Sequence, residues 1–352
     1  MTAGLTAEVS RAWLRRVLLV NLAGQVLIVL SGGIVRLTGS GLGCPTFPKC
    51  VSGSYIPVVR QPQGYHKYIE FGNRMLAPTL TLISIVALVA VWRHVRATRP
   101  TSGGRRLLWL GWVPLTGVLA QALIGGISVL TKLNPTVVAI HFLVSMALIA
   151  GSTVLLLVAV PDPDNVANRD DVANRDDVAN RDDVANPPDG ERRAAPGGLV
   201  RLLAAALAVI TGPVLTLGTV VTGSGPHSGD ANDPNRFSFD IQTVARLHAA
   251  AVWAFLLLLV ALIVLLRRAP GGGRALRPAR ILLALTLAQG VIGYLQYALG
   301  VPIALVALHM LGAALIVAGV ARTVFTVFTT DLQRTGPAPA APPSQHPETA
   351  LI

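Results

Sequence analysis

Residues 136–160 read TVVAIHFLVSMALIAGSTVLLLVAV, and this stretch decides the fold class. It contains no Lys, Arg, Asp or Glu, and its one histidine is His141. An α-helix rises 1.5 Å per residue, so about 20 apolar residues cross the hydrocarbon core of a bilayer. The segment is longer than that, and the sequence therefore predicts that it crosses a membrane as a helix.

The rest of the chain has the same character. Of its 352 residues, 52% are hydrophobic and 13% are charged, about half the charged fraction of an ordinary soluble domain. Comparable apolar runs lie at about 15–36, 71–92, 107–130, 199–222, 243–266, 281–299 and 302–328. We therefore predict an all-α membrane protein with eight transmembrane helices. The first run is too long for a cleaved signal sequence and is expected to remain as the first helix.

The basic residues indicate the orientation of the chain. Its net charge is +12, but Lys and Arg cluster at the ends of the apolar runs, which argues against a nucleic-acid partner. Of the 29 Lys and Arg residues, 21 fall on the side that holds both termini, which the positive-inside rule places in the cytoplasm. The eight on the other side are Arg36, Lys49, Arg60, Lys67, Arg74, Lys132, Arg236 and Arg246. We expect a multi-pass protein of the cell membrane with both termini cytoplasmic.

The two halves of the chain repeat one another. Gln121, Ile124, Gly125 and His141 recur 168 residues later as Gln289, Ile292, Gly293 and His309, and the TGSG of 38–41 recurs at 222–225. Each half holds four predicted helices, so both copies enter the membrane from the same side. We expect two tandem, pseudo-symmetric four-helix bundles, an N-terminal half at 1–160 and a C-terminal half at 199–328.

Two segments outside these halves have a different composition. Residues 161–198 contain VANRDD three times in tandem and then a Pro-rich stretch, and residues 329–352 are rich in Pro and Ala. Such segments cannot bury a core. We predict a disordered cytoplasmic linker and a disordered cytoplasmic tail.

Three of the seven histidines fall inside predicted helices at a similar depth: His141, His248 and His309. An ionisable side chain in a membrane span is costly and indicates function by default. A hydrogen bond between helices is the simpler explanation for one histidine, but three at one depth favour metal or haem binding. Zinc or copper would need more ligands, whereas imidazoles on facing helices of a bundle suit haem.

The two halves differ in their candidate ligands. In the second half, His248 and His309 are placed to bind one iron from opposite faces. In the first half, His141 is the repeat partner of His309, but Asn73 occupies the position equivalent to His248. His66, seven residues earlier, could substitute only if its helix begins early or its loop folds inward. We expect a doubly ligated haem in the second half and a more open site, suited to a reaction, in the first.

Glu70 and a cysteine pair complete the candidate site residues. Glu70 lies three residues before Asn73 on the same helix face. It either pairs with Arg74 and the helix dipole, or it handles protons or stabilises positive charge at the first-half site. Cys44 and Cys50 lie in an outer loop, where an oxidising exterior favours a disulfide. That disulfide is either a staple holding the loop over the first-half site or a redox-active pair.

Taken together, these motifs resemble the haem A synthase family. The matching residues are RLTGSGLGCP at 36–45, IEFGNR at 69–74 and the histidines His141, His248 and His309, and the resemblance covers about residues 11–328. In that family the enzyme oxidises a ring methyl group of haem O to a formyl group, giving haem A for terminal oxidases. The resemblance implies haem b as a cofactor with His248 and His309 as axial ligands. It also implies that haem O reacts at His141, with Glu70 as the important carboxylate.

The resemblance implies further features and has one departure. It implies a disulfide between Cys44 and Cys50, and haem O synthase and an electron acceptor as partners. The family typically has Glu-x-x-His where this chain has Glu70 and Asn73, so a role for His66 stays open. Two other functions use similar residues: a dihaem cytochrome for quinol-linked electron transfer, and a haem or small-molecule transporter. The cytochrome predicts two equivalent ligand pairs, which Asn73 argues against.

Overall fold

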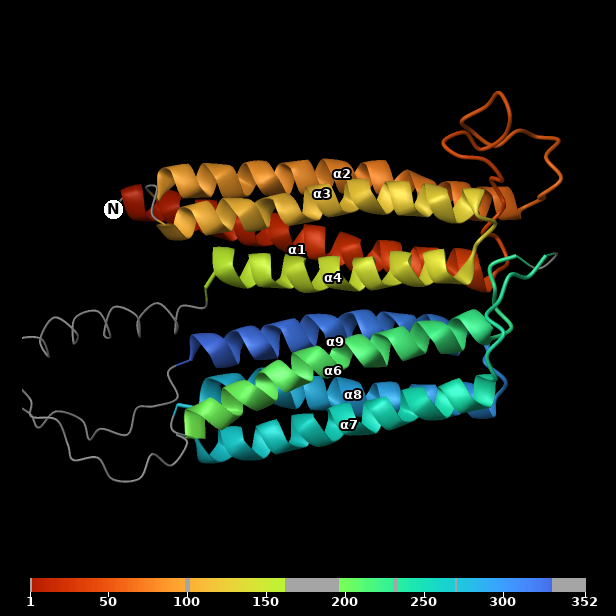
Figure 1. The fold of residues 1–352 in the computed structure, drawn as a ribbon. Coiled ribbons are helices and arrows are strands. Elements are labelled where there is room, and N and C mark those ends of the chain that lie inside the picture. Colours follow the sequence, from red (N-terminus) through yellow and green to blue (C-terminus); the bar gives the residue numbers. More distant parts are fainter. Residues whose placement is uncertain (1, 99–101, 162–195, 231–232, 270, 331–352) are drawn as a thin grey trace, which may run out of the picture.

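The computed structural model describes residues 2–98, 102–161, 196–230, 233–269 and 271–330 (Figure 1). These residues form eight helices, each long and apolar enough to cross a membrane, and they include only isolated β-bridges. The predicted all-α membrane fold is confirmed. The VANRDD repeats and almost all of the predicted tail lie outside the described residues. The helices are α1 (Thr2–Leu37), α2 (His66–Ala97), α3 (Ser102–Leu130), α4 (Pro135–Ala159), α6 (Pro196–Ser224), α7 (Ile241–Arg268), α8 (Gly273–Ala298) and α9 (Ile303–Thr329).

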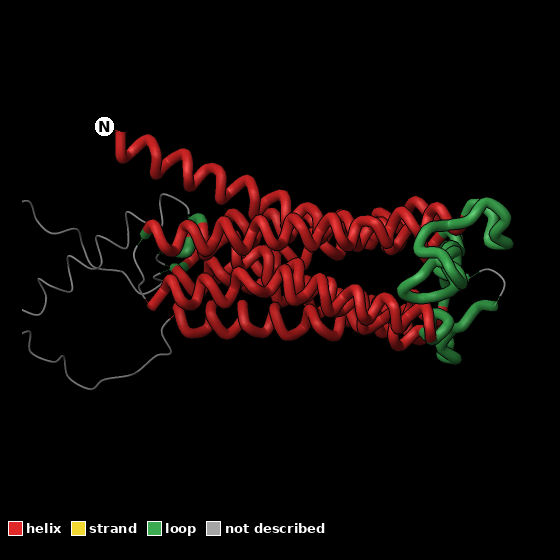
Figure 2. Tube along the Cα trace, turned by 90° about the horizontal axis from the view of Figure 1, so that it is seen from above, coloured by secondary structure: helices red, strands yellow, loops and turns green. Residues whose placement is uncertain are grey.

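The helices form two bundles that lie side by side (Figure 1). In the first bundle, α1 and α3 each pack against α2 and α4; in the second, α6 and α8 each pack against α7 and α9. The bundles meet where α9 contacts α1 and α4, and where α4 contacts α6. The long loops 38–65 and 225–240 gather at one end of the helices (Figures 1 and 2). We call this the loop end, and the opposite end, where the N-terminus lies, the terminal end.

Each bundle has its packed core toward the terminal end. In the first bundle, Leu14 and Leu18 near the start of α1 pack with Val91 and Val95 near the end of α2. The second core joins all four helices and includes Leu207, Leu259, Leu266 and Leu282. In a bilayer, close packing of such side chains rather than exclusion of water holds helices together. A third cluster joins the two bundles through Val29, Met146, Ile149, Ala314 and Val317.

The loop end is where the two bundles are tied by polar contacts. Arg36, near the end of α1, donates from Nε to the carbonyl oxygen of His227 (2.8 Å). The N–H of Gly41 donates to the carbonyl oxygen of Gly229 (2.8 Å). His227 in turn bonds through Nε2 to the carbonyl oxygen of Val301 (3.0 Å), between α8 and α9. These contacts fix the loops of one bundle against those of the other.

Local sequence signals set where the histidine-bearing helices begin. Asn134 caps α4 by accepting a bond from the N–H of Thr136 (3.0 Å), and Asp240 caps α7 by accepting from the N–H of Thr243 (2.8 Å). Bonds from the Thr243 hydroxyl and N–H lower the pKa of Asp240 below its ordinary value. Pro302 immediately precedes α9. The starts of these helices determine how deep their histidines lie.

Candidate functional site

A cavity of about 1240 Å³ lies in the loop-end part of both bundles. Its volume exceeds the range of about 300–1,000 Å³ typical of small-molecule sites. Its walls are mainly apolar and come from both bundles and from the loop that follows α1. The sequence-predicted residues that line it are Glu70, Asn73, His141, His248 and His309. Side chains far apart in the chain thus meet in one space.

The three helix histidines lie at one level. His141, His248 and His309 are six, seven and six residues after the first residues of α4, α7 and α9. At 1.5 Å per residue, each lies about 10 Å from the start of its helix. All three side chains line the cavity, so a ligand there can meet imidazoles from both bundles.

Each of these rings packs against a glycine of a neighbouring helix. The pairs are His141 with Gly125, His248 with Gly218, and His309 with Gly293. A Cβ atom added at any of the three glycines would lie 3.2–3.3 Å from the Cε1 atom of the ring. The glycines therefore allow the helices to approach closely and fix the planes of the rings.

The ring nitrogens differ in their partners. Nδ1 of His248 bonds to the carbonyl oxygen of Val214 (3.1 Å), which places the proton on Nδ1 and leaves the Nε2 lone pair available. Nε2 of His248 is therefore the nitrogen left for a ligand, and Nδ1 of His141 and of His309 is a buried polar atom that no described residue satisfies.

A repeated glutamine holds the backbone at two of the histidines. Nε2 of Gln121 donates to the carbonyl oxygen of His141 (2.9 Å), and Nε2 of Gln289 donates to that of His309 (2.6 Å). Gln121 also bonds the hydroxyl of Ser145. The two glutamines are repeat partners, so the repeat extends from sequence to a shared hydrogen bond.

Asn73 lies where the second bundle has His248. Its Oδ1 accepts a bond from the hydroxyl of Ser31 on α1 (2.6 Å), while His248 bonds to Val214 on α6. Under the 184-residue repeat, Ser31 corresponds to Leu215, the neighbour of Val214. Asn73 on α2 and His248 on α7 therefore bond, to within one residue, to corresponding positions of α1 and α6, the first helices of their bundles. The first bundle directs one imidazole into the cavity and the second directs two.

His66 is not among the residues that line the cavity. It is the first residue of α2, so this helix begins earlier than the predicted 71. Its Nδ1 bonds the hydroxyl of Ser40 (2.9 Å), and its ring stacks on Tyr65 with centroids 4.1 Å apart. The seven residues from His66 to Asn73 correspond to about 10 Å along the helix, which places the ring above the level of the other histidines.

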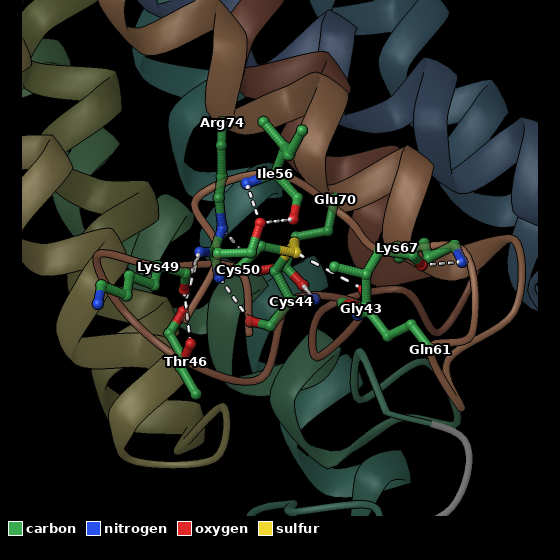
Figure 3. The surroundings of a disulfide bond; sticks show 12 residues. Gly43, Cys44, Thr46, Lys49, Cys50, Ile56, Gln61, Lys67, Glu70 and Arg74 are labelled. Atoms are coloured by element: carbon green, nitrogen blue, oxygen red, sulfur yellow. Dashed lines mark hydrogen bonds and ion pairs between the residues drawn. A yellow bond between two sulfur atoms is a disulfide. The ribbon is translucent and has the colours of Figure 1, made fainter. Parts of the chain in front are cut away.

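The disulfide between Cys44 and Cys50 is formed, and both cysteines are fully buried (Figure 3). We call residues 44–50 the disulfide loop. Oε2 of Glu70 accepts a bond from the N–H of Cys44 (2.6 Å), and Oε1 pairs with Nη2 of Arg74 (2.6 Å). Arg74 also donates to the carbonyl oxygens of Cys44 (2.6 Å) and Thr46 (2.9 Å). Glu70 thus lines the cavity and, with Arg74, attaches the disulfide loop to α2.

The sequence analysis did not place several cavity residues in the site, among them Gln25, Arg36 and Phe47. Gln25 of α1 is 3% exposed and lines the cavity, and its Nε2 has no partner within the described chain. Arg36 lines it where the bundles meet, with Nη2 donating to the carbonyl oxygen of Thr222 (3.0 Å). Polar side chains in apolar spans were the signal for these two. Phe47 of the disulfide loop also lines the cavity, and no local pattern predicts this.

The donor set fits haem. Among the residues that the structure describes, no three His, Cys, Asp or Glu side chains come together as a metal-binding group, whereas zinc sites need three or four protein ligands. His248 on α7 and His309 on α9 line the same cavity at one level. Two neutral imidazoles within apolar walls, with glycines against their rings, suit the axial ligation of a haem.

The fold and the cavity define a multi-pass membrane protein in which two four-helix bundles direct imidazoles into one shared cavity. Residues 15–180 match the family of cytochrome oxidase assembly proteins (COX15-CtaA). The chain is 35% identical over 138 residues to the heme A synthase of Lysinibacillus sphaericus (strain C3-41), which covers 38% of this chain and 40% of that protein. Residues 15–180 of the chain are therefore similar to this cytochrome oxidase assembly family.

Two further heme A synthases match this chain over a comparable length. The one from Geobacillus thermodenitrificans is 30% identical over 135 residues, covering 38% of this chain and 39% of the relative. The one from Shouchella clausii (strain KSM-K16) is 30% identical over 144 residues, covering 41% of this chain and 44% of the relative. The matches thus span about two fifths of the length of these curated relatives.

Proposed function

We propose that this protein is a haem A synthase, which oxidises a ring methyl group of haem O to a formyl group. The observation that carries this proposal is the asymmetry of the cavity. The second bundle presents two imidazoles, and the first presents one imidazole and an asparagine in the place of the other. A fully ligated haem iron suits electron transfer, while an open position suits a reacting centre. The family match of residues 15–180 supports the same conclusion.

In this proposal the second bundle, within 199–328, holds haem b between His248 and His309. The Nδ1 bond of His248 to Val214 fixes its tautomer, and Gly218 and Gly293 fix the ring planes. Bound there, haem b supplies a one-electron redox centre beside the first-bundle site. The repeat supports this position, because His309 on α9 and its repeat partner His141 on α4 both lie six residues after the start of their helix.

The first bundle, within 1–160, binds the substrate haem O through His141. On the other side, the Asn73 carboxamide offers no imidazole nitrogen, and its oxygen already accepts a bond from Ser31. That leaves a coordination position open. Conversion of a methyl group to a formyl group removes electrons and protons from the carbon and adds one oxygen atom, which water supplies. The electrons pass to the electron acceptor, and the open position leaves room for this chemistry close to the iron.

Glu70 supplies the carboxylate of the first-bundle site. It is the one Asp or Glu among the described residues that line the cavity. We assign its carboxylate to stabilising positive charge at the reacting carbon or to accepting a proton from it, a contribution of about 10²–10⁴-fold for positioned acids and bases. The pairing with Arg74 and the bond from Cys44 hold the carboxylate in place for that task.

The orientation follows from the distribution of basic residues. We place the loop end at the outer surface of the cell membrane and both termini in the cytoplasm. Haem O synthase is then the source of the substrate, and an electron acceptor removes the reducing equivalents. The cavity then lies at the level of the outer leaflet.

Extraction of the haems from purified full-length protein tests the function. The protein is produced in cells that make haem O, and its extracted haems are separated by chromatography. Haem A or hydroxylated haem O alongside haem b supports the synthase. Haem b alone would support the electron-transfer cytochrome, and purified protein without any haem would support the transporter. Either of the last two results overturns the proposal.

A further inference from the structure

At one position of the repeat, the aromatic ring that lines the cavity comes from a helix in the second bundle and from a loop in the first. Tyr294 of α8 lines the cavity, and its hydroxyl accepts a bond from Nε1 of Trp253 on α7 (3.2 Å). Under the 168-residue repeat, the counterpart of Tyr294 is Gly126 of α3. The space in front of Gly126 holds the ring of Phe47: a Cβ atom at Gly126 would lie 2.6 Å from two of its carbons. In the first bundle, a loop residue thus supplies the aromatic ring that a helix residue supplies in the second bundle.

Phe47 belongs to the disulfide loop, whose position depends on α2. The loop is closed by the Cys44–Cys50 bond and attached through the Glu70 and Arg74 contacts described above (Figure 3). Phe47 is 37% exposed and Pro48 beside it also lines the cavity. The loop therefore carries the ring of Phe47 at the cavity wall, whereas a helix, α8, carries that of Tyr294.

We propose that Phe47 is a substrate-contacting wall of the first-bundle site that controls how tightly haem O is held and how fast it exchanges. This inference rests on the proposed function, because it takes the first bundle as the substrate site. The flat, apolar porphyrin is the kind of ligand that an aromatic ring packs against, and aromatic contacts contribute about 0.5–1.5 kcal/mol beyond area burial, or up to about tenfold in affinity. A wall carried by a loop suits a ligand that must enter and leave.

The matched control is a second loop phenylalanine. Phe237 lies in the loop 225–240, and a Cβ atom at Gly223 would lie 2.6 Å from its ring, as at Gly126 and Phe47. Phe237, however, is not among the residues that line the cavity. Phe47→Ala and Phe237→Ala therefore remove the same kind of loop-to-glycine contact, one inside the cavity and one outside it.

The experiment measures the release of haem O from purified full-length protein, followed by absorbance after transfer to an excess of a haem-binding acceptor protein. We expect Phe47→Ala to release haem O up to about tenfold faster than wild type. Phe237→Ala should match wild type, and the second-bundle haem spectrum should stay unchanged in both variants. Gly126→Ala, which displaces the ring from the helix side and leaves the loop sequence intact, should also accelerate release.

Equal release rates in wild type, Phe47→Ala and Gly126→Ala would overturn the inference. Thiol labelling of each variant shows whether the Cys44–Cys50 bond is intact, and Phe47→Tyr, which keeps a ring, should restore slow release. The two proposals fail separately. If the protein converts haem O but Phe47→Ala releases it at the wild-type rate, only the role of Phe47 is contradicted. If Phe47→Ala accelerates release but the protein never converts haem O, only the synthase function is contradicted.

Discussion

The two bundles build their share of the cavity from different parts of the chain. In the second bundle, both candidate ligands and the aromatic pair Trp253 and Tyr294 belong to helices. In the first bundle, His141 is the one cavity-lining histidine among the described residues and belongs to α4, and part of the wall belongs to the disulfide loop. The second-bundle part of the cavity is thus lined by helices at these positions, and the first-bundle part also includes a loop. In the proposed function, this difference separates the bundle that binds the cofactor from the bundle in which the substrate reacts.

Removing the histidines tests this division most strongly. We expect His248→Ala and His309→Ala to abolish the spectrum of a low-spin haem in the purified protein, because each removes an axial ligand. His141→Ala should keep that spectrum and lose conversion of haem O. Absorbance spectra and product analysis on the same samples measure both effects. An equal loss of haem b in all three variants would show that the bundles do not differ in role.

Glu70→Gln separates binding from chemistry within the first bundle. The amide keeps an oxygen that can accept the bond from Cys44 but removes the charge that pairs with Arg74. We expect haem binding to persist and turnover of haem O to fall about 10²–10⁴-fold. Arg74→Gln is the control, since it also breaks the pair but retains the carboxylate. Wild-type turnover in Glu70→Gln would leave Glu70 with only its structural role at the disulfide loop.

Asn73→His would make the first bundle resemble the second. The new imidazole lies at the level of His248, next to the Ser31 hydroxyl that now bonds Asn73. We expect the first-bundle haem to become low-spin with both axial positions filled, and conversion to decline because the open position is lost. The readout is a second low-spin signal in the spectrum. If the spectrum of Asn73→His matches wild type, Asn73 does not face the iron.

The sequence predicted the helices and the level of the histidines, but only part of the cavity. Eight apolar runs and the repeat offsets suffice for the fold, because bilayer thickness and helix rise determine both. The position of the His66 ring could not be predicted, because the sequence around His66 does not indicate that its Nδ1 bonds to the hydroxyl of Ser40. Phe47 was also beyond prediction, because its neighbour Gly126 lies 79 residues away and the contact depends on how the disulfide loop folds back over α3.

The smallest expected effect concerns the repeated glutamines. Gln289→Ala removes the bond to the carbonyl oxygen of His309, and Gln121→Ala removes the matching bond to His141 together with the bond to Ser145. The counterpart of Ser145 in the second bundle is Ala313, which offers no hydroxyl.

Hydrogen bonds between membrane helices contribute about 0.6 kcal/mol on average. We therefore expect Gln121→Ala to lower the free energy of unfolding in detergent by about 1.2 kcal/mol, and Gln289→Ala by about half as much. In a Ser145→Ala background the two substitutions should cost the same, because each then removes one bond. If they already cost the same in the wild-type background, the Ser145 bond adds nothing. One glutamine bond to the histidine backbone would then stabilise each bundle equally at the level of the histidines. The two bundles would differ only at the loop end.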